Sequence, residues 1–166
     1  MNRDLDSMEN YVVRSVEIER DHGKVSILQV ADSPGVAARL FSALSDSGIN
    51  VDLIIQNVSE DGLSDITFTV PRSSLDEAAG ICRRVSEEIG CRSVDADAGI
   101  AKVSVCGVGM RSHPGVAAWM FGALAEAGIN IEMISSSEIK ISCVVRDSDA
   151  ERAEKVVADA FEIDAD

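Results

Sequence analysis

The chain repeats itself, and this internal repeat constrains the fold more than any other feature of the sequence. Three blocks recur in the same order: Lys24-Val25-Ser26-Ile27 as Lys102-Val103-Ser104-Val105, Pro34-Gly35-Val36-Ala37-Ala38 as Pro114-Gly115-Val116-Ala117-Ala118, and Gly48-Ile49-Asn50 as Gly128-Ile129-Asn130. The offset is 78 residues for the first block and 80 for the other two (102 − 24, 114 − 34 and 128 − 48). Self-similarity of this kind indicates copies of one structural unit. The chain of 166 residues is therefore predicted to form two small domains.

The hydrophobic pattern predicts strand, helix, strand, strand and helix in each repeat. In the first repeat the expected strands are 25–30, 51–58, 66–70 and a short 93–96, and the helices carry apolar faces over 36–44 and 75–89. In the second repeat the expected strands are 103–108, 131–135 and 139–145, and the apolar helix faces cover 116–124 and 153–161. Ser74 with Glu77, and Ser148 with Glu151, match the capping-box pattern that starts a helix.

The strand count differs between the repeats, because the second has one strand too few. The segment Tyr11 to Glu19 is a further strand candidate ahead of the first repeat. We expect it to cross over and complete the second sheet. Each domain is then a βαββαβ unit of the α+β class, with two helices on one face of a four-stranded antiparallel sheet. The expected division is a flexible tail at 1–10, a first domain at 24–97, and a second domain at 11–19 plus 101–163.

Charge and composition exclude several classes of function. The chain has 15 Lys and Arg against 29 Asp and Glu, a formal net charge of −14, which argues against a nucleic-acid partner. No apolar run approaches the roughly 18 residues that a membrane span requires. The acidic, polar start of the sequence does not match a secretory signal. We therefore expect a cytoplasmic protein without a membrane partner.

The cysteines do not form a metal-binding pattern. Cys82, Cys91, Cys106 and Cys143 are scattered, with no pair at the C-x-x-C spacing. A zinc site needs closely spaced ligands. We interpret these residues as small apolar side chains, and we expect no metal, no cofactor and no catalytic residue in this chain.

The loop between the first strand and the first helix is the most distinctive local motif. It reads Ala31-Asp32-Ser33-Pro34-Gly35-Val36-Ala37. The backbone N–H groups of Gly35, Val36 and Ala37 at a helix N-terminus suit a carboxylate, and Asp32 suits an ammonium. Together they describe the backbone end of an amino acid, to which Gln56 on the adjacent strand would add a hydrogen bond. The alternative is that Asp32 and Ser33 only cap the helix.

The second copy of this loop lacks one of these groups. Ser112 stands where the first copy has Asp32, so the carboxylate seat remains but the ammonium partner is missing. Two equivalent sites are therefore not expected. His113 is interpreted as a packing or capping residue.

The strand containing Leu53-Ile54-Ile55 is apolar on both faces. A sheet with helices on only one face would leave half of this strand uncovered. We expect that face to pack against another copy of the unit, within the chain or between two chains.

Five motifs are specific enough to indicate a family. In the first repeat they are Asp32-x-Pro34-Gly35, Gly48-Ile49-Asn50-Val51-Asp52 and Gln56-Asn57-Val58-Ser59, and in the second they are Ser112-His113-Pro114-Gly115-Val116 and the segment from Asn130 to Ile139. These motifs resemble the first and the second ACT domain of aspartate kinases, respectively. The resemblance runs from about Val12 to Phe161. It implies two ferredoxin-like ACT domains that form the regulatory part of an aspartate kinase, without the catalytic domain.

The resemblance also implies partners and binding residues. It implies a homodimer formed through the ACT sheets, a catalytic chain or domain as partner, and feedback inhibition by threonine, by lysine or by both. The implied effector-binding residues are Asp32, Pro34, Gly35, Val36, Ala37, Gln56, Asn130 and Ile131. Ser59, Ala117, Ser137 and Glu132 mark a second effector site. L-threonine is favoured, because an L-lysine side chain needs an acceptor for its ε-ammonium and only Glu132 and Asp52 are candidates.

Two other functions compete with this interpretation. The chain could be a purely structural dimerisation module that holds kinase chains together and binds no effector. It could also be a small independent enzyme, which would need a reactive group such as His113 or a cysteine.

Overall fold

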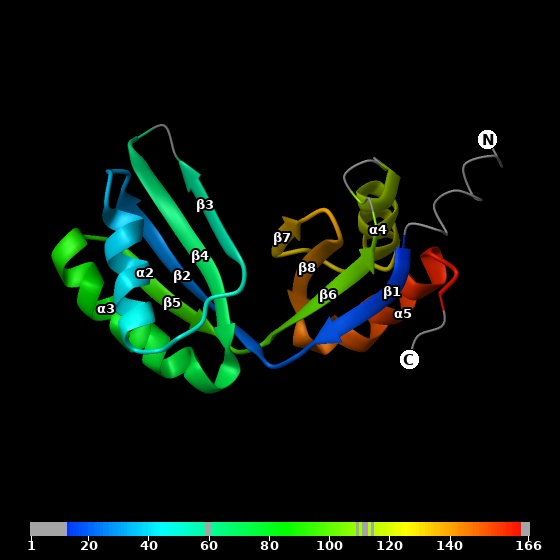
Figure 1. The fold of residues 1–166 in the computed structure, drawn as a ribbon, viewed down its shortest axis with the longest axis horizontal. Helices are drawn as coiled ribbons and strands as arrows, with labels where there is room; N and C mark the ends of the chain where they lie inside the picture. The colour runs from blue at the N-terminus through cyan, green and yellow to red at the C-terminus, as the bar shows by residue number, and fades with distance from the viewer. Residues whose placement is uncertain (1–12, 59–60, 109, 111–112, 114, 164–166) are drawn as a thin grey trace. The chain divides into compact units, whose positions relative to one another are not determined.

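The computed structural model describes residues 13–58, 61–108, 110, 113 and 115–163, and it divides into two compact units (Figure 1). The first unit is Asp21–Ala98, and the second is Gly99–Asp166 together with Met1–Arg20. The expected tail at 1–10 lies outside the described residues. No helix in the described ranges has the length and apolar character needed to cross a lipid bilayer.

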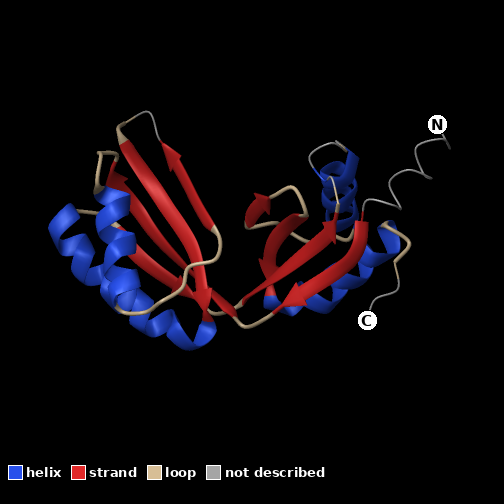
Figure 2. Cartoon of the chain, viewed as in Figure 1, coloured by secondary structure: helices blue, strands red, loops and turns tan. Residues whose placement is uncertain are grey.

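The first unit is a four-stranded antiparallel sheet with two helices packed on one face (Figure 2). Along the chain its elements are β2 (His22–Ala31), α2 (Val36–Asp46), β3 (Ile54–Val58), β4 (Leu63–Pro71), the 3-10 turn η1 (Arg72–Ser74), α3 (Leu75–Ile89) and β5 (Ser93–Asp97). The strand order is β3-β4-β2-β5. Alternate residues of β2 and β4, including Ile27, Ile66 and Phe68, are buried against the helices. The alternation read from the sequence therefore gives the inner face of this sheet.

The second unit repeats this arrangement with one strand from elsewhere in the chain. Its elements are β1 (Val13–Glu19), β6 (Ile100–Gly107), α4 (Gly115–Glu126), β7 (Met133–Ser136), β8 (Lys140–Arg146), the 3-10 turn η3 (Asp147–Asp149) and α5 (Ala150–Ala160). The strand order is β1-β6-β8-β7, so β1 takes the place that β5 has in the first sheet. Val16 of β1 lies opposite Val105, and Ile18 lies opposite Val103. This pairing is the crossover that the strand count predicts.

Backbone hydrogen bonds close the first helix of each unit in the same way. The N–H of Ile49 donates to the carbonyl of Leu44 at 3.0 Å, and the N–H of Ile129 donates to the carbonyl of Leu124 at 2.9 Å. Each helix is thus followed by the same turn, which leads into the outer strand β3 or β7. The Gly-Ile-Asn motif of both repeats has this structural role.

Two local expectations from the sequence are wrong. The strand expected at 51–58 begins only at Ile54, because the Thr69 side chain accepts the N–H of Leu53 at 3.1 Å and interrupts the regular ladder. The two capping boxes do not form, since α3 and α5 begin without a side-chain cap. The 3-10 turns η1 and η3 lead directly into these helices and replace the caps.

Candidate functional site

A cavity of about 430 Å³ lies at the N-terminal end of α2 in the first unit. Its lining residues come from the loop after β2, the first turn of α2, and the strands β3 and β4: Ala31, Asp32, Ser33, Pro34, Gly35, Val36, Ala37, Gln56 and Ser64. Six residues selected from the sequence are in this set, namely Asp32, Pro34, Gly35, Val36, Ala37 and Gln56. The volume lies in the range of small-molecule sites in proteins. The structure thus brings these six residues together around one cavity.

The first turn of α2 presents backbone donors to this cavity. Gly35 is the N-cap residue with φ 96°, and no side chain caps the helix. Among the described residues, no protein acceptor is bonded to the N–H of Gly35 or Ala37. The N–H of Val36 does have an acceptor, the carbonyl of Ser33 at 3.3 Å. The expectation of three open amides is therefore corrected to two, and the alternative in which Asp32 or Ser33 caps the helix is wrong.

Among the described residues, Asp32 supplies the only charged side chain in the lining of the cavity. The residue is exposed, and within the described ranges its carboxylate forms no ion pair. Its backbone N–H donates to the carbonyl of Gly62 at 2.9 Å, which holds the loop next to the start of β4. A negative side chain thus stands beside two open backbone donors at a positive helix end. This arrangement suits a ligand that carries both charges.

The floor of the cavity is formed by one side chain from each of two neighbouring strands. Gln56 comes from β3 and Ser64 from β4. The Gln56 Nε2 donates to the Ser64 Oγ at 3.4 Å. Sequence reasoning missed Ser64, although the alternation Ser64, Ile66, Phe68 already places it on the helix-covered face. The sequence does contain a signal for it, because Ser64 is a polar residue at the end of a row of alternating apolar residues.

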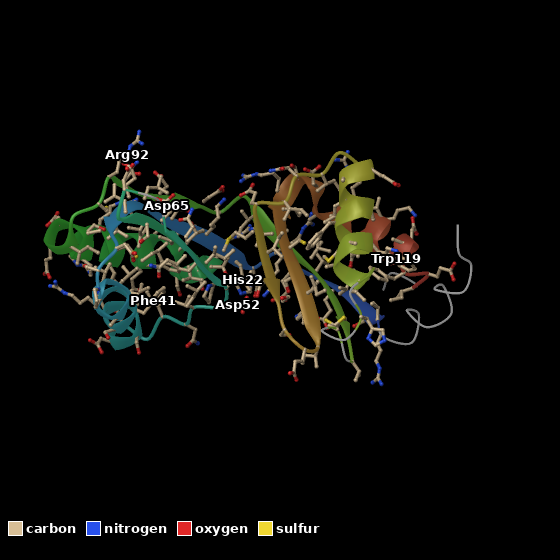
Figure 3. All side chains as sticks on the ribbon, turned by 90° about the horizontal axis from the view of Figure 1, so that it is seen from above. His22, Phe41, Asp52, Asp65, Arg92 and Trp119 are labelled. Carbon is tan, nitrogen blue, oxygen red and sulfur yellow. The ribbon has the colours of Figure 1, made fainter. Side chains whose placement is uncertain are left out.

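A bulge in β2 shapes the loop that leads to the cavity. The register between β2 and β4 shifts between Ile27 and Val30, and Gln29 has φ 53°. The Gln29 N–H donates to the Asp65 Oδ1 at 2.8 Å, and the Asp65 N–H donates to the Asn57 Oδ1 at 3.1 Å. Asp65 is labelled on β4 in Figure 3. These two side chains satisfy backbone donors at the irregular part of the sheet, next to Ala31 and Asp32.

The remaining residues of the predicted effector site belong to the second unit. Asn130 and Ile131 follow α4, where Asn130 is exposed and Ile131 is half-buried against the core. They are not part of the lining described above. Their part in ligand binding stays a prediction.

The second predicted site also stays a prediction. Ser59 lies outside the described residues, and Ala117 is half-buried on α4. Glu132 is paired with Arg146 at 3.2 Å. The Ser137 hydroxyl donates to the carbonyl of Lys140 at 3.3 Å and accepts the N–H of Ile139 at 3.4 Å. The polar groups of Glu132 and Ser137 therefore already have protein partners.

The cysteines have the structural role expected of them. All four are free thiols, and Cys82 and Cys143 are buried in the cores of the first and second unit. Burial raises the pKa of Cys82 to about 11 and that of Cys143 to about 12. These thiols stay protonated near neutral pH, which disfavours a nucleophilic role.

Comparison with known proteins matches both units to one family. A model of the ACT domain matches residues 26–84 and 103–161. The chain is 48% identical over 160 residues to an aspartate kinase of Pseudomonas fluorescens, a match that covers 96% of this chain and 39% of the relative. The chain thus spans about two fifths of the length of the curated relatives it matches.

Two solved structures match this chain over nearly their own full length. The regulatory subunit of aspartate kinase from Thermus thermophilus, in a ligand-free form, is 41% identical with a TM-score of 0.87, and the match covers 90% of this chain and 99% of that one. A crystal structure of aspartokinase alpha and beta subunits is 42% identical with a TM-score of 0.86, covering 91% and 99%. Together with the two matched domains, these similarities show that the chain belongs to the ACT-domain family, as the tandem ACT regulatory region of an aspartate kinase.

Proposed function

We propose that this chain is the effector-sensing part of an aspartate kinase and that a free α-amino acid binds in the cavity at the start of α2. The observation that carries the proposal is the combination, around one cavity, of two backbone amides and the Asp32 carboxylate, none of which has a partner among the described residues. The effector carboxylate accepts from the N–H groups of Gly35 and Ala37, and its ammonium binds Asp32. Gln56 contributes a further hydrogen bond from the floor.

L-threonine is the proposed effector, with L-lysine as the alternative. A lysine side chain brings a second ammonium, which needs an acceptor when water is excluded. Asp32 is the only charged residue in the lining as far as the structure describes it. The two other candidates are already engaged, because Asp52 lies 3.8 Å from the His22 Nε2 and Glu132 is paired with Arg146. A neutral side chain therefore fits this cavity better.

The proposed output of binding is feedback inhibition of a catalytic chain or domain. An effector that prefers one arrangement of paired ACT units shifts the kinase toward that arrangement, with a coupling free energy of about 1–3 kcal/mol. The proposed pairing is between two copies of this chain. Ile54 and Ile134, at equivalent positions of the outer strands β3 and β7, are 53% and 45% exposed, which supports pairing through these edges.

The competing function is that of a structural dimerisation module without an effector. The same exposed isoleucines would support it. The two functions differ in ligand binding, so a dimer that forms without amino acids and shows no thermal shift with them would favour the structural module.

Calorimetric titration with L-threonine and L-lysine tests the proposal. We expect L-threonine to release or absorb measurable heat, and Asp32→Ala to weaken its binding about 10–100-fold, the loss typical of a hydrogen bond to a charged group. Asp46→Ala is the matched control, because it removes the same charge at the other end of α2, about 15 Å along the helix. Absence of heat with every amino acid, or equal affinities of the two variants, would contradict the proposal.

A further inference from the structure

A histidine and a carboxylate meet in the first unit, away from the cavity at the start of α2. His22 is the first residue of β2, and Asp52 lies in the segment between α2 and β3. The His22 Nε2 lies 3.8 Å from the Asp52 Oδ2, and both residues are labelled in Figure 3. The His22 side chain is 14% exposed and that of Asp52 is 41% exposed. A largely buried imidazole thus lies beside a carboxylate that solvent reaches.

Backbone pairing fixes both residues on the end of β4. His22 pairs with Pro71 across the sheet, and the N–H of Asp52 donates to the carbonyl of Thr69 at 3.0 Å. Thr69 and Pro71 are two residues apart on the same strand. The two side chains are therefore presented by hydrogen-bonded backbone, as a preorganised binding site requires.

A second carboxylate faces the other ring nitrogen of His22. The Asp21 Oδ1 lies 2.9 Å from the His22 Nδ1, and the backbone of Asp21 is held in place because its carbonyl accepts the N–H of Arg72 at 2.6 Å. Histidines that bind metal ions usually have a carboxylate at the ring nitrogen that does not bind the ion. Such a carboxylate keeps the proton on that nitrogen and leaves the lone pair of the other for the metal. With Nδ1 beside Asp21, the lone pair of Nε2 is available on the side of Asp52.

The separation of the His22 Nε2 and the Asp52 Oδ2 distinguishes two ways of joining them. A direct hydrogen bond needs about 2.7–3.2 Å, which is shorter than the observed 3.8 Å. Two ligand atoms bound at about 2.1 Å to one tetrahedral ion lie about 3.4 Å apart, which is closer to the observed value. We propose that His22 and Asp52 bind one divalent transition-metal ion of the Zn²⁺ or Ni²⁺ type, which suits imidazole and carboxylate donors. Water completes the coordination, and Asp21 orients the imidazole.

The second unit provides a contrast at the equivalent carboxylate. Glu132 corresponds to Asp52, because the N–H groups of both donate to equivalent carbonyls of β8 and β4. Glu132 is paired with Arg146 at 3.2 Å, whereas the first unit has Pro71 at the position of Arg146. An arginine balances the acid permanently but cannot bind a metal ion, while a neutral histidine can. The fold therefore does not require a histidine beside this acid.

The proposed site lies outside the features that guided the sequence analysis. The expectation of no metal depended on the spacing of the cysteines, and this site uses none of them. His22 and Asp52 are 30 residues apart (52 − 22), so they form no short motif. None of the residues around the cavity at α2 takes part, so the proposal is independent of amino-acid binding.

Nickel chloride is the probe, because Ni²⁺ binds imidazole and its unpaired electrons broaden the NMR signals of nearby nuclei. We expect the full chain to bind Ni²⁺ in calorimetric titrations near neutral pH and the signals of His22 and Asp52 to broaden first. Asp21→Asn should weaken binding about 10–100-fold, as the loss of a carboxylate behind a metal-binding histidine does. His22→Gln and Asp52→Ala remove a ligand and should each weaken it at least as much.

Two matched variants serve as controls. His113→Gln removes the other histidine of the chain, and Asp46→Asn removes an exposed acid at the end of α2. Both should bind Ni²⁺ as the unaltered chain does. Circular dichroism verifies that every variant is folded, and the NMR titration of the unaltered chain locates the ion without any substitution.

The outcomes decide between a metal site and a simple ion pair. Broadening centred on His22 that is lost in His22→Gln would establish the site. If the unaltered chain binds no Ni²⁺, His22 and Asp52 form an ion pair only and the inference is overturned. Broadening centred on His113 or on the cysteines, or an unchanged affinity of His22→Gln, would overturn it as well. Every one of these results leaves the proposed amino-acid cavity to its own test.

Discussion

The two units share one topology but differ in the residues around the N-terminal end of their first helix, α2 or α4. In the first unit, Asp32, Gln56 and Ser64 surround a cavity. The corresponding residues of the second repeat are Ser112, Ser136 and Ile139, of which Ser112 lies outside the described residues. The strands and helices keep their order because the apolar pattern is the same in both repeats. The comparison teaches that a few polar residues at one end of the sheet distinguish the unit with the candidate cavity from its copy.

The largest fully buried side chain of the first unit, Phe68, lies in the sheet, whereas that of the second unit, Phe161, lies in the helix layer. Phe68 of β4 corresponds to Cys143 of β8, since they lie opposite the equivalent residues Val25 and Val103. Ser86 corresponds to Phe161, because each follows the first residue of its helix by the same distance (75 to 86 and 150 to 161). The ring comes from the sheet in one unit and from the helix layer in the other. Each core thus holds one fully buried phenylalanine, although the position of that ring differs between the units.

The largest effect on stability is expected when either of these two rings is removed, which tests whether they have the same role in their cores. Phe68→Ala and Phe161→Ala each empty a site that is at most 1% exposed, so each should lower the free energy of unfolding of its unit by about 3–5 kcal/mol. Phe68 packs edge-on against Phe41, and Phe161 packs against Trp119, with ring centroids 5.4 and 6.1 Å apart. Phe41 and Trp119 are labelled in Figure 3.

Urea unfolding measures both variants. Trp119 is the one tryptophan of the chain, so its fluorescence follows the second unit, while circular dichroism follows both. A loss below about 1 kcal/mol in either variant would show that the exchanged rings are not equivalent core residues.

Two glycines, one at the start of α2 and one within α4, allow the first helices of the two units to be compared further. Gly35 has φ 96°, a conformation that side chains with a Cβ rarely adopt, so Gly35→Ala should destabilise the chain by about 1–2 kcal/mol. Gly122, within α4, has open space where a Cβ would lie. Gly122→Ala should therefore stabilise the chain by about 0.5–1 kcal/mol. Opposite signs in urea unfolding are expected, and a gain in stability for Gly35→Ala would refute the assigned conformation.

The smallest effect on stability is expected at β1, the strand that joins the second sheet from the other side of the first unit in the sequence. The Lys140 Nζ lies 2.8 Å from the Glu17 Oε2 and 3.4 Å from the Glu19 Oε1. Hydrogen bonds from Lys140 and then Cys106 hold the pKa of Glu17 below its usual 4.5. Both side chains of the Glu17 pair are partly exposed, so Lys140→Met should cost at most about 1 kcal/mol at pH 7.

The pH dependence of this effect has a defined sign. A carboxyl whose pKa is lowered in the folded state stabilises the fold above its usual pKa, and the contribution is lost as the pH falls through the lowered value. The difference between Lys140→Met and the unaltered chain should therefore be present at pH 7 and shrink toward pH 3. Lys155→Met, which removes a lysine paired with Asp159 on α5, should leave the NMR-measured pKa of Glu17 unchanged. An equal cost at both pH values would argue against the Glu17 pair.

Sequence patterns predicted most of the fold, because the spacing of apolar residues along the chain depends on which side chains are buried. The alternation in β4 and the three-to-four spacing in α2 reflect which residues face the core, and the structure confirms the four-stranded α+β architecture of both units. The errors occur where local hydrogen bonds compete. The late start of β3 depends on the Thr69 side chain, and the absent capping boxes depend on the turns η1 and η3. Competition of this kind, between alternative hydrogen-bond partners of the same backbone group, produces no periodic pattern of apolar residues in the sequence.

The chemistry of the candidate site was partly predictable for a related reason. Asp32 and Gly35 are adjacent in a motif, so their joint use at a helix end follows from local chain geometry. Ser64 is 32 residues away from Asp32 (64 − 32). Its place in the cavity depends on the register between β4 and its neighbours, which only the paired sheet defines. The bulge at Gln29, held by Asp65, is equally a product of that pairing.

The sequence by itself determined that two copies of one α+β unit would form, because a repeated pattern of apolar residues must bury the same faces twice. It also determined which loop carries Asp32 and the glycine at the start of the helix. Only the tertiary structure decided that Val36 already has a partner and that a buried serine lies beneath the loop. The reason is that hydrogen-bond partners depend on how segments distant in the sequence pair with one another. The burial of a residue, by contrast, follows from the pattern of apolar residues beside it in the chain.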